Sequence, residues 1–162
     1  MRYKFLIAAI LIAGGISSCK KESRYKYEVQ EQVLYQSSAQ KNTAKTPTQF
    51  ISIAYNDLFN AAITTNELNT LSVDLQACGD KNMMEDLIIK NLLAKANQQI
   101  PDNNTMREDI PAFVTQTYVR FYNRQPTEFE AWKMQQLIQQ NTDITPQMIY
   151  YAVMTSEEYK YY

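Results

Sequence analysis

The chain has 162 residues, enough for one folded domain with a hydrophobic core and too few for a multidomain enzyme. It contains no histidine and only three glycines, which excludes histidine-based nucleophile activation, most zinc sites and glycine-rich phosphate loops. The net charge is −1, and −3 without Arg2 and Lys4 of the first 18 residues (14 basic against 17 acidic residues). Nucleic acid is therefore a poor partner, because phosphate binding needs a clustered basic surface.

The first 19 residues carry an export pattern. A short basic start precedes twelve apolar residues, 5–16, fewer than the roughly 20 that a membrane-spanning helix needs, so residues 1–18 are predicted to be a signal peptide. The sequence ISSC at 16–19 resembles the bacterial lipobox. This resemblance implies cleavage between Ser18 and Cys19, and attachment of acyl chains to Cys19. Two or three chains hold a protein stably, because each buried CH₂ contributes about 0.8 kcal/mol.

The residues after the cysteine bear on localisation. Lys20 and Lys21 differ from the signals that retain lipoproteins in the inner membrane, which favours the outer membrane of a bacterial envelope. Whether the protein faces the periplasm or the cell surface stays open. Lipidation of Cys19 would leave Cys78 without an intramolecular disulfide partner, and we expect Cys78 to be a small buried residue at a helix end.

Residues 19–46 are interpreted as the lipidated cysteine and a flexible tether. Residues 37–45 contain no large apolar side chain and therefore cannot bury enough area to offset the entropy lost on ordering. The helical domain is predicted to begin at residue 47. It would then stand at the end of a spacer that leads from the membrane.

An internal repeat is the main pattern of residues 47–162. A shift of 63 residues aligns aromatic, capping and acidic positions: Phe50 with Phe113, Tyr55 with Tyr118, Asn60 with Asn123, Thr64 with Thr127, and Glu67 with Glu130. A shift of 61 aligns the aliphatic residues that follow. We therefore predict an all-α domain of two tandem copies of a three-helix unit, about 47–95 and 111–159, packed as one bundle.

Capping residues and apolar periodicity place the predicted helices. Capping boxes at Thr64 and Thr127 begin the second helix of each copy, and Pro146 begins the last main helix. Residues 96–109 are predicted to be a surface loop, and Trp132 the packing centre of the second copy. The predicted helices are about 48–60, 65–78 and 81–95 in the first copy, and about 111–123, 128–140 and 146–154 in the second. Ser156 is expected to cap a short terminal turn.

The second copy resembles a short helical repeat of bacterial surface and extracellular proteins, and shares part of its pattern with phycobilisome linker domains. The resemblance covers roughly 113–159 and depends on an aromatic first helix, the turn NRQP at 123–126, Trp132 and the ending SEEY at 156–159. Asn123 stands where the family has glycine. The resemblance implies a module used in assembly or at the cell surface, and it transfers no catalytic residue.

Two groups of residues are candidates for partner binding. Arg124, in the repeat's turn, would either hold an anionic partner or, as is more common, bind a nearby carboxylate. Five tyrosines near the C-terminus predict an exposed aromatic patch for a protein or glycan partner: Tyr150, Tyr151, Tyr159, Tyr161 and Tyr162.

No catalytic residue, metal site or cofactor is predicted. Glu128 and Glu130 could in principle serve as the acid–base pair of a glycosidase. They do not face each other on a helix, however, and Glu130 is explained as a cap partner. The oxygen-rich segments 80–86 and 102–104 do not follow the calcium-loop pattern and sit where turns favour Asp and Asn.

Three functions are weighed on these grounds. The leading hypothesis is a membrane-anchored, non-catalytic interaction or assembly module of the cell envelope. The alternatives are an envelope hydrolase that uses Asp/Glu acid–base chemistry, and a structural subunit of a larger envelope complex.

Overall fold

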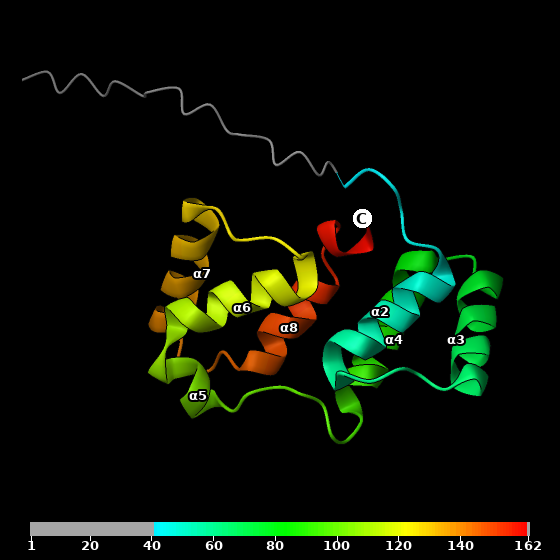
Figure 1. The fold of residues 1–162 in the computed structure, drawn as a ribbon, viewed down its shortest axis with the longest axis horizontal. Helices are drawn as coiled ribbons and strands as arrows, with labels where there is room; N and C mark the ends of the chain where they lie inside the picture. Colours follow the sequence, from blue (N-terminus) through cyan, green and yellow to red (C-terminus); the bar gives the residue numbers. More distant parts are fainter. Residues whose placement is uncertain (1–40, 162) are drawn as a thin grey trace, which may run out of the picture. The chain divides into compact units, whose positions relative to one another are not determined.

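The computed structural model describes residues 41–161. The predicted signal peptide, Cys19, most of the predicted tether and Tyr162 lie outside the described residues. The described part is all-α, with seven helices, a terminal 3₁₀ turn and no β-strand, which confirms the predicted fold class (Figure 1). None of these helices is both long enough and apolar enough to cross a membrane.

Three helices form the first half, and each begins at a side-chain cap. The side chains of Thr46, Thr64 and Asp80 each accept a hydrogen bond from the backbone N–H three residues later, which satisfies one of the free donors at the helix start. At Thr64 the capping box is incomplete, because Glu67 forms an ion pair with Lys95 instead of reaching back to the cap. The helices are α2 (Pro47–Phe59), α3 (Thr65–Ala77) and α4 (Lys81–Ala94).

The second half contains four helices and the 3₁₀ turn. These elements are α5 (Asn103–Glu108), α6 (Ile110–Tyr122), α7 (Glu128–Gln140), α8 (Pro146–Met154) and η1 (Glu158–Lys160). The bounds of the six main helices agree with the predicted ones to within one residue. Thr127 and Glu130 complete the predicted capping box of α7, and Thr145 caps α8.

Corresponding turns of the two halves have the same backbone geometry. Asn60 ends α2 with φ 50°, and Asn123 ends α6 with φ 53°, both in the left-handed region that asparagine tolerates better than most residues. The halves differ in packing, since α3 lies against both α2 and α4, whereas α7 lies mainly against α6. Descent of the two halves from one duplicated unit stays a prediction.

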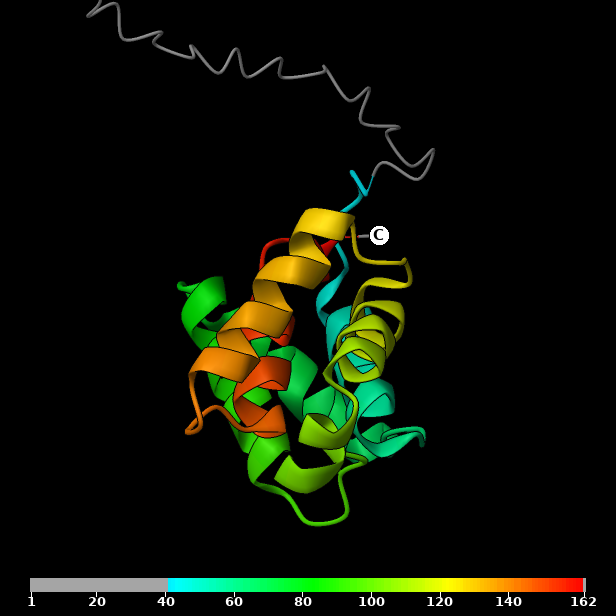
Figure 2. The same cartoon turned by 90° about the vertical axis from the view of Figure 1, so that its left-hand side faces the viewer.

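The core joins the two halves, and α4 contacts α8 between them (Figures 1 and 2). Aliphatic and aromatic side chains from both halves form one buried cluster. Members of this cluster that are fully buried include Ile51, Leu58, Ile89, Met106, Val114, Ile138, Met154 and Tyr159.

Two predictions about the second half are wrong. Residues 96–109 are not only a surface loop, because Asp102 caps the short helix α5 and Met106 on that helix is 0% exposed. Trp132 is not a packing centre, since it is 55% exposed beside the exposed Phe129. The reason is that α7 has a single buried residue, Ile138, and turns the face with Trp132 to the solvent.

The segment 41–46 lies along the C-terminal turn, although the two are more than 100 residues apart in sequence. Ala44 and Tyr161 form an isolated antiparallel bridge, and the Lys45 N–H donates to the Lys160 carbonyl at 2.9 Å. Tyr159 of the turn is completely buried, with its ring 6.1 Å from that of Phe50 and 6.1 Å from that of Phe121. This turn therefore ties together α2, α6 and the start of the described chain.

Candidate functional site

The predicted tyrosine patch is wrong for two of its members. Tyr150 is 4% exposed and Tyr159 0%, so both belong to the core, where Tyr150 packs its ring against Phe121 at 4.7 Å. Tyr151 is half-buried and donates to Asp86 at 2.5 Å. Tyr161 is 37% exposed, and Tyr162 lies outside the described residues. Aromatic side chains on the inner face of α8 and its following turn were drawn into the core by the hydrophobic effect.

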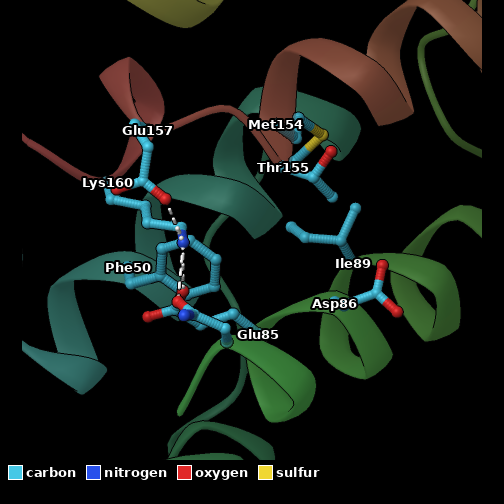
Figure 3. A pocket seen from close by; sticks show the side chains of 9 residues that line it. Phe50, Glu85, Asp86, Ile89, Met154, Thr155, Glu157 and Lys160 are labelled. Carbon is cyan, nitrogen blue, oxygen red and sulfur yellow. Dashed lines mark hydrogen bonds and ion pairs between the residues drawn. The ribbon is translucent and has the colours of Figure 1, made fainter.

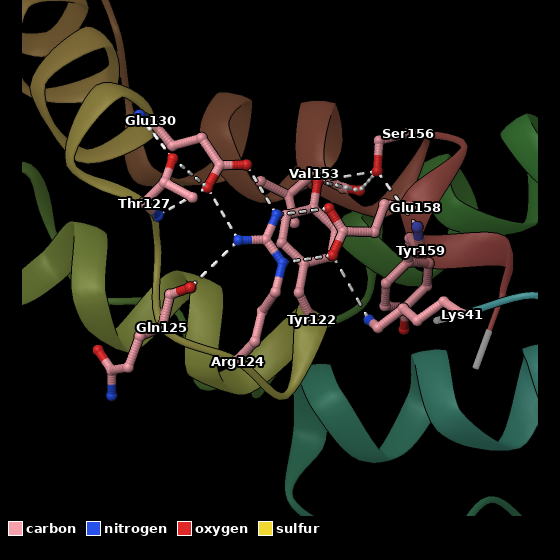
Figure 4. A network of polar contacts seen from close by, with 10 residues as sticks. All are labelled: Lys41, Tyr122, Arg124, Gln125, Thr127, Glu130, Val153, Ser156, Glu158 and Tyr159. Carbon is pink, nitrogen blue, oxygen red and sulfur yellow. Dashed lines mark hydrogen bonds and ion pairs between the residues drawn. The ribbon is translucent and has the colours of Figure 1, made fainter. Parts of the chain in front are cut away.

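The sequence left open whether Arg124 holds an anionic partner or binds a nearby carboxylate, and the structure shows the second arrangement. Its guanidinium binds Glu130 through two bonds of 2.8 and 2.7 Å, and Glu158 through two of 2.6 and 2.7 Å (Figure 4). The Gln125 carbonyl accepts a further bond at 3.1 Å. A guanidinium has five N–H donors, and these five bonds use all of them. The two carboxylates raise the pKa of Arg124 further above its usual value.

Glu130 has two structural tasks in this network. Hydrogen bonds from Arg124, and then from Thr127, lower the pKa of Glu130 to about 2. The same carboxylate accepts from the Thr127 backbone N–H at 2.8 Å and from its hydroxyl at 2.9 Å. Glu130 is therefore held in its ionised form and cannot supply the proton that a glycosidase general acid must give.

A cavity of about 430 Å³ opens next to Arg124, between α2, α6 and the segment 41–46. We call it the basic pocket. Four cations and one carboxylate line it: Lys41, Lys45, Arg120, Arg124 and Asp57. Ile53, Phe121, Tyr122 and Tyr161 supply its apolar and aromatic surface.

The cations of the basic pocket differ in how fully their donors are used. Lys45 donates to the Tyr159 carbonyl at 2.5 Å, and its ammonium lies 3.9 Å from the centre of the Tyr159 ring. Burial lowers the pKa of Lys45 to about 8, with a smaller contribution from the like charge of Lys41 and an opposing one from Asp57. Arg120 donates to the Gln99 carbonyl at 2.8 Å. Of the four cations of the pocket, only Arg124 was predicted from the sequence. Lys41 and Lys45 were not, because a lysine in a polar segment usually indicates a solvated surface, nor was Arg120, because no local motif marks it.

A second cavity, of about 270 Å³, lies across the C-terminal turn, and we call it the acidic pocket (Figure 3). Its charged lining residues are Glu85, Asp86, Glu157 and Lys160, and Phe50 is among its apolar ones. One oxygen of Glu85 is buried without a hydrogen-bond partner, and the Lys160 ammonium lies 3.5 Å from it. Lys160 donates instead to Glu157 at 2.9 Å. In this arrangement the chain's own lysine balances part of the acidic charge.

The remaining polar candidates have local structural roles. Asp80 caps α4 through the Met83 N–H at 3.0 Å, and Asp102 caps α5 through the Thr105 N–H at 2.8 Å. Cys78 is only half-buried, so the expectation of a buried residue is wrong. Its thiol donates to the Asp80 carbonyl at 3.3 Å. Within residues 41–161, no group of three or more acidic or thiol side chains is placed to hold a metal ion.

The charged side chains therefore gather in two pockets of opposite sign, which the C-terminal turn lines through Lys160 and Tyr161. Comparison of the chain with protein-family models, with curated proteins and with solved structures gave no match. The function is accordingly argued from the residues themselves.

Proposed function

We propose that the chain is a lipid-anchored, non-catalytic interaction module of a bacterial envelope, held at the outer membrane through Cys19. The ISSC sequence at 16–19 supports the anchor. One observation carries the binding role: residues 41–46, the last part of the proposed tether, contribute Lys41 and Lys45 to the basic pocket. Anchor and pocket would then be parts of one continuous stretch of chain, so that membrane attachment presents the pocket to an envelope partner.

The carboxylates support a binding role over hydrolysis. Glu130 and Glu158 both bind the same guanidinium, and Asp86 accepts from Lys90 at 2.7 Å and from Tyr151. An acid–base pair needs one carboxyl group with a raised pKa facing an ionised one across a cleft. In the part of the chain described, these three carboxylates are instead engaged in ion pairs. Burial raises the pKa of Asp57, but this carboxyl group accepts from the Tyr159 hydroxyl, and among the described residues no second carboxylate lines its pocket.

The anchor is tested by metabolic labelling with a radioactive or clickable fatty acid, followed by fractionation of the envelope. We expect the wild-type chain to be labelled and to sediment with outer membranes, and Cys19→Ala to lose both properties. Cys78→Ala is the matched control and should keep both. Continued labelling of Cys19→Ala would contradict the proposal.

The interaction role is tested by affinity isolation from cross-linked, detergent-solubilised envelopes. A stoichiometric partner is expected with the wild-type chain, and it should be reduced by Lys45→Gln, which alters the basic pocket. Turnover of an envelope polymer by the purified protein, lost on replacing a single carboxylate, would contradict the non-catalytic assignment.

A further inference from the structure

We propose that the basic pocket binds a single carboxylate group carried on an apolar stem. This inference deepens the proposed function and rests on it. Such a group occurs at the C-terminal residue of a polypeptide and in small aryl or alkyl carboxylic acids. These sources share the chemistry that the pocket recognises, and the experiment below separates them.

The charges around the pocket leave room for one anion. Four cations meet there, and the three carboxylates closest to them are those of Asp57, Glu130 and Glu158, the last two already bound to Arg124. Lys41 is 3.7 Å from Glu158, on the outer side of the same network. The sum is one excess positive charge, in a chain whose overall charge is negative. A monoanionic carboxylate balances this excess, whereas a dianionic phosphate would exceed it.

Hydrogen-bond donors are also available. Arg120 uses one of its five N–H groups on the Gln99 carbonyl, and Lys45 uses one of its three on the Tyr159 carbonyl. Asp57 does not neutralise them by direct contact, because among the described residues its hydrogen bond is to the Tyr159 hydroxyl, at 2.8 Å. Lys45 and Arg120 can therefore each direct a charge-assisted bond at an incoming carboxylate.

The pocket also has a place for an apolar stem. Phe121 and Ile53 form part of its wall, and Tyr161 at its edge is 37% exposed. Its volume of about 430 Å³ fits a group the size of one or two residues, within the range of ordinary small-ligand sites. Aromatic walls beside a few charged donors suit a ligand with one anionic end and one apolar end.

A bound anion would also offset the unfavourable burial of the Lys45 ammonium near other cations. Lys45 is half-buried and shares the pocket with Lys41 on its own segment, Arg120 on α6 and Asp57 on α2. Its ammonium also lies over the ring of Tyr159 on η1. A carboxylate at the ammonium would favour its charged form and raise its pKa. Binding is therefore expected to weaken as the pH rises from 7 to 9.5, because free Lys45, with a pKa of about 8, loses its proton across this range.

The test titrates the purified full-length protein with 3-phenylpropionate, followed by NMR of the Arg120 side-chain N–H and the amides of α2 and α6. Saturable shifts at these positions are expected, and their absence would overturn the proposal. Lys45→Gln and Arg120→Gln should each weaken binding at least tenfold. Lys133→Gln, which removes an exposed lysine on α7, is the matched control and should bind as the wild type does. Thermal unfolding establishes that each variant is folded.

Three further probes define the ligand. The uncharged analogue 3-phenylpropanol should bind at least tenfold more weakly than the acid, and inorganic phosphate no better than 3-phenylpropanol. If 3-phenylpropanol bound as tightly as 3-phenylpropionate, or if phosphate bound more tightly than 3-phenylpropanol, the carboxylate assignment would be overturned. A pentapeptide ending in phenylalanine, with a free or an amidated C-terminus, distinguishes the sources. Preference for the free peptide over 3-phenylpropionate assigns a polypeptide terminus, and the reverse assigns a small acid.

These measurements use purified protein and do not depend on lipid labelling. A failed titration beside a successful Cys19 experiment would reject the carboxylate site and leave the anchored module standing. Saturable binding of 3-phenylpropionate beside a wild-type chain that takes up no fatty acid would support the carboxylate site and reject the lipid anchor.

Discussion

At the scale of single residues, Arg124 stabilises the fold by using all five of its N–H donors in hydrogen bonds. It joins the turn after α6 to the first turn of α7 through Glu130, and to the C-terminal turn through Glu158. The Arg124 and Glu130 side chains are 25% and 29% exposed, so the pair is partly shielded from solvent. Its contribution should therefore exceed that of an ordinary surface ion pair.

Arg124→Met is predicted to destabilise the domain by about 2–3 kcal/mol, since Glu130 would lose its ion-pair partner and Glu158 would keep only the more distant Lys41. Arg124→Lys should recover only part of this loss, because an ammonium cannot bind two carboxylates bidentately. Urea unfolding followed by circular dichroism measures both. Lys133→Met on the exposed face of α7 is the control, and a loss of equal size there would contradict a specific role for Arg124.

Acid should weaken the same network in a defined range of pH. The folded-state pKa of Glu130 is about 2, below its ordinary value of 4.5, so the stabilisation is fully present above about pH 4.5 and is lost as the pH falls towards 2. Urea unfolding at pH 7, 4 and 3 should show a steeper loss for the wild type than for Glu130→Gln. Glu128→Gln, two residues earlier on α7, should follow the wild type, and an identical slope for all three proteins would reject this explanation.

At the scale of elements, the helices end without the glycines that commonly end them. Gly79 is the only glycine after residue 18, and it does not adopt a positive φ. Two helices end at left-handed asparagines, and three others have their last carbonyls bound by side chains. The Lys81 ammonium binds carbonyls at the end of α3, the Gln98 amide those at the end of α4, and Arg107 those at the end of α7.

Arg107 on α5 is predicted to be the main support of the α7–α8 connection. Its guanidinium donates to the carbonyls of Ile138, Asn141, Thr142 and Ile144 at 2.9–3.1 Å. Arg107→Met should cost about 1–2 kcal/mol and speed amide hydrogen exchange in residues 141–145, because these carbonyls lose their partner. Hydrogen exchange followed by mass spectrometry measures this. Arg120→Met should leave exchange in 141–145 unchanged, and unchanged exchange in Arg107→Met would contradict the assigned role.

At the scale of the whole molecule, the C-terminal turn fastens the two halves to each other. Tyr159 places its ring between Phe50 of α2 and Phe121 of α6, and its hydroxyl donates to Asp57 of α2. The backbone of 41–46 covers the same turn through its bond to Lys160. The basic and acidic pockets flank this turn, so its docking also shapes both candidate sites.

Removing the Tyr159 side chain is predicted to cost about 3–5 kcal/mol in Tyr159→Ala, because a fully buried ring leaves a cavity at the junction of the halves. Tyr159→Phe keeps the ring and should cost less, about 1.5–2 kcal/mol, for the lost bond to the Asp57 carboxylate. Differential scanning calorimetry of both variants measures the effect. Tyr161→Phe at the exposed end of the turn is the control, and a small loss in Tyr159→Ala would show that the turn does not join the halves.

Much of the helical architecture follows from local chemistry that the sequence displays. The bounds of six helices agree to within one residue, because the caps at Thr64, Thr127 and Thr145 act within three residues of themselves. The same reasoning found Arg124 as an important residue, from its turn motif. It did not find Glu158, because a partner 34 residues away is selected by packing and not by spacing.

Taken by itself, the sequence determined the all-α class, the helix bounds and the exclusion of histidine and glycine-loop chemistry, since composition and short-range hydrogen bonds decide these. Only the tertiary structure decided that Trp132 faces solvent, that Tyr159 is buried, and that residues 103–108 form α5. It also brought Lys45 from the polar N-terminal segment to Arg120 of α6, which makes the basic pocket. These outcomes depend on which distant surfaces come together to exclude water, and a local sequence pattern does not contain that information.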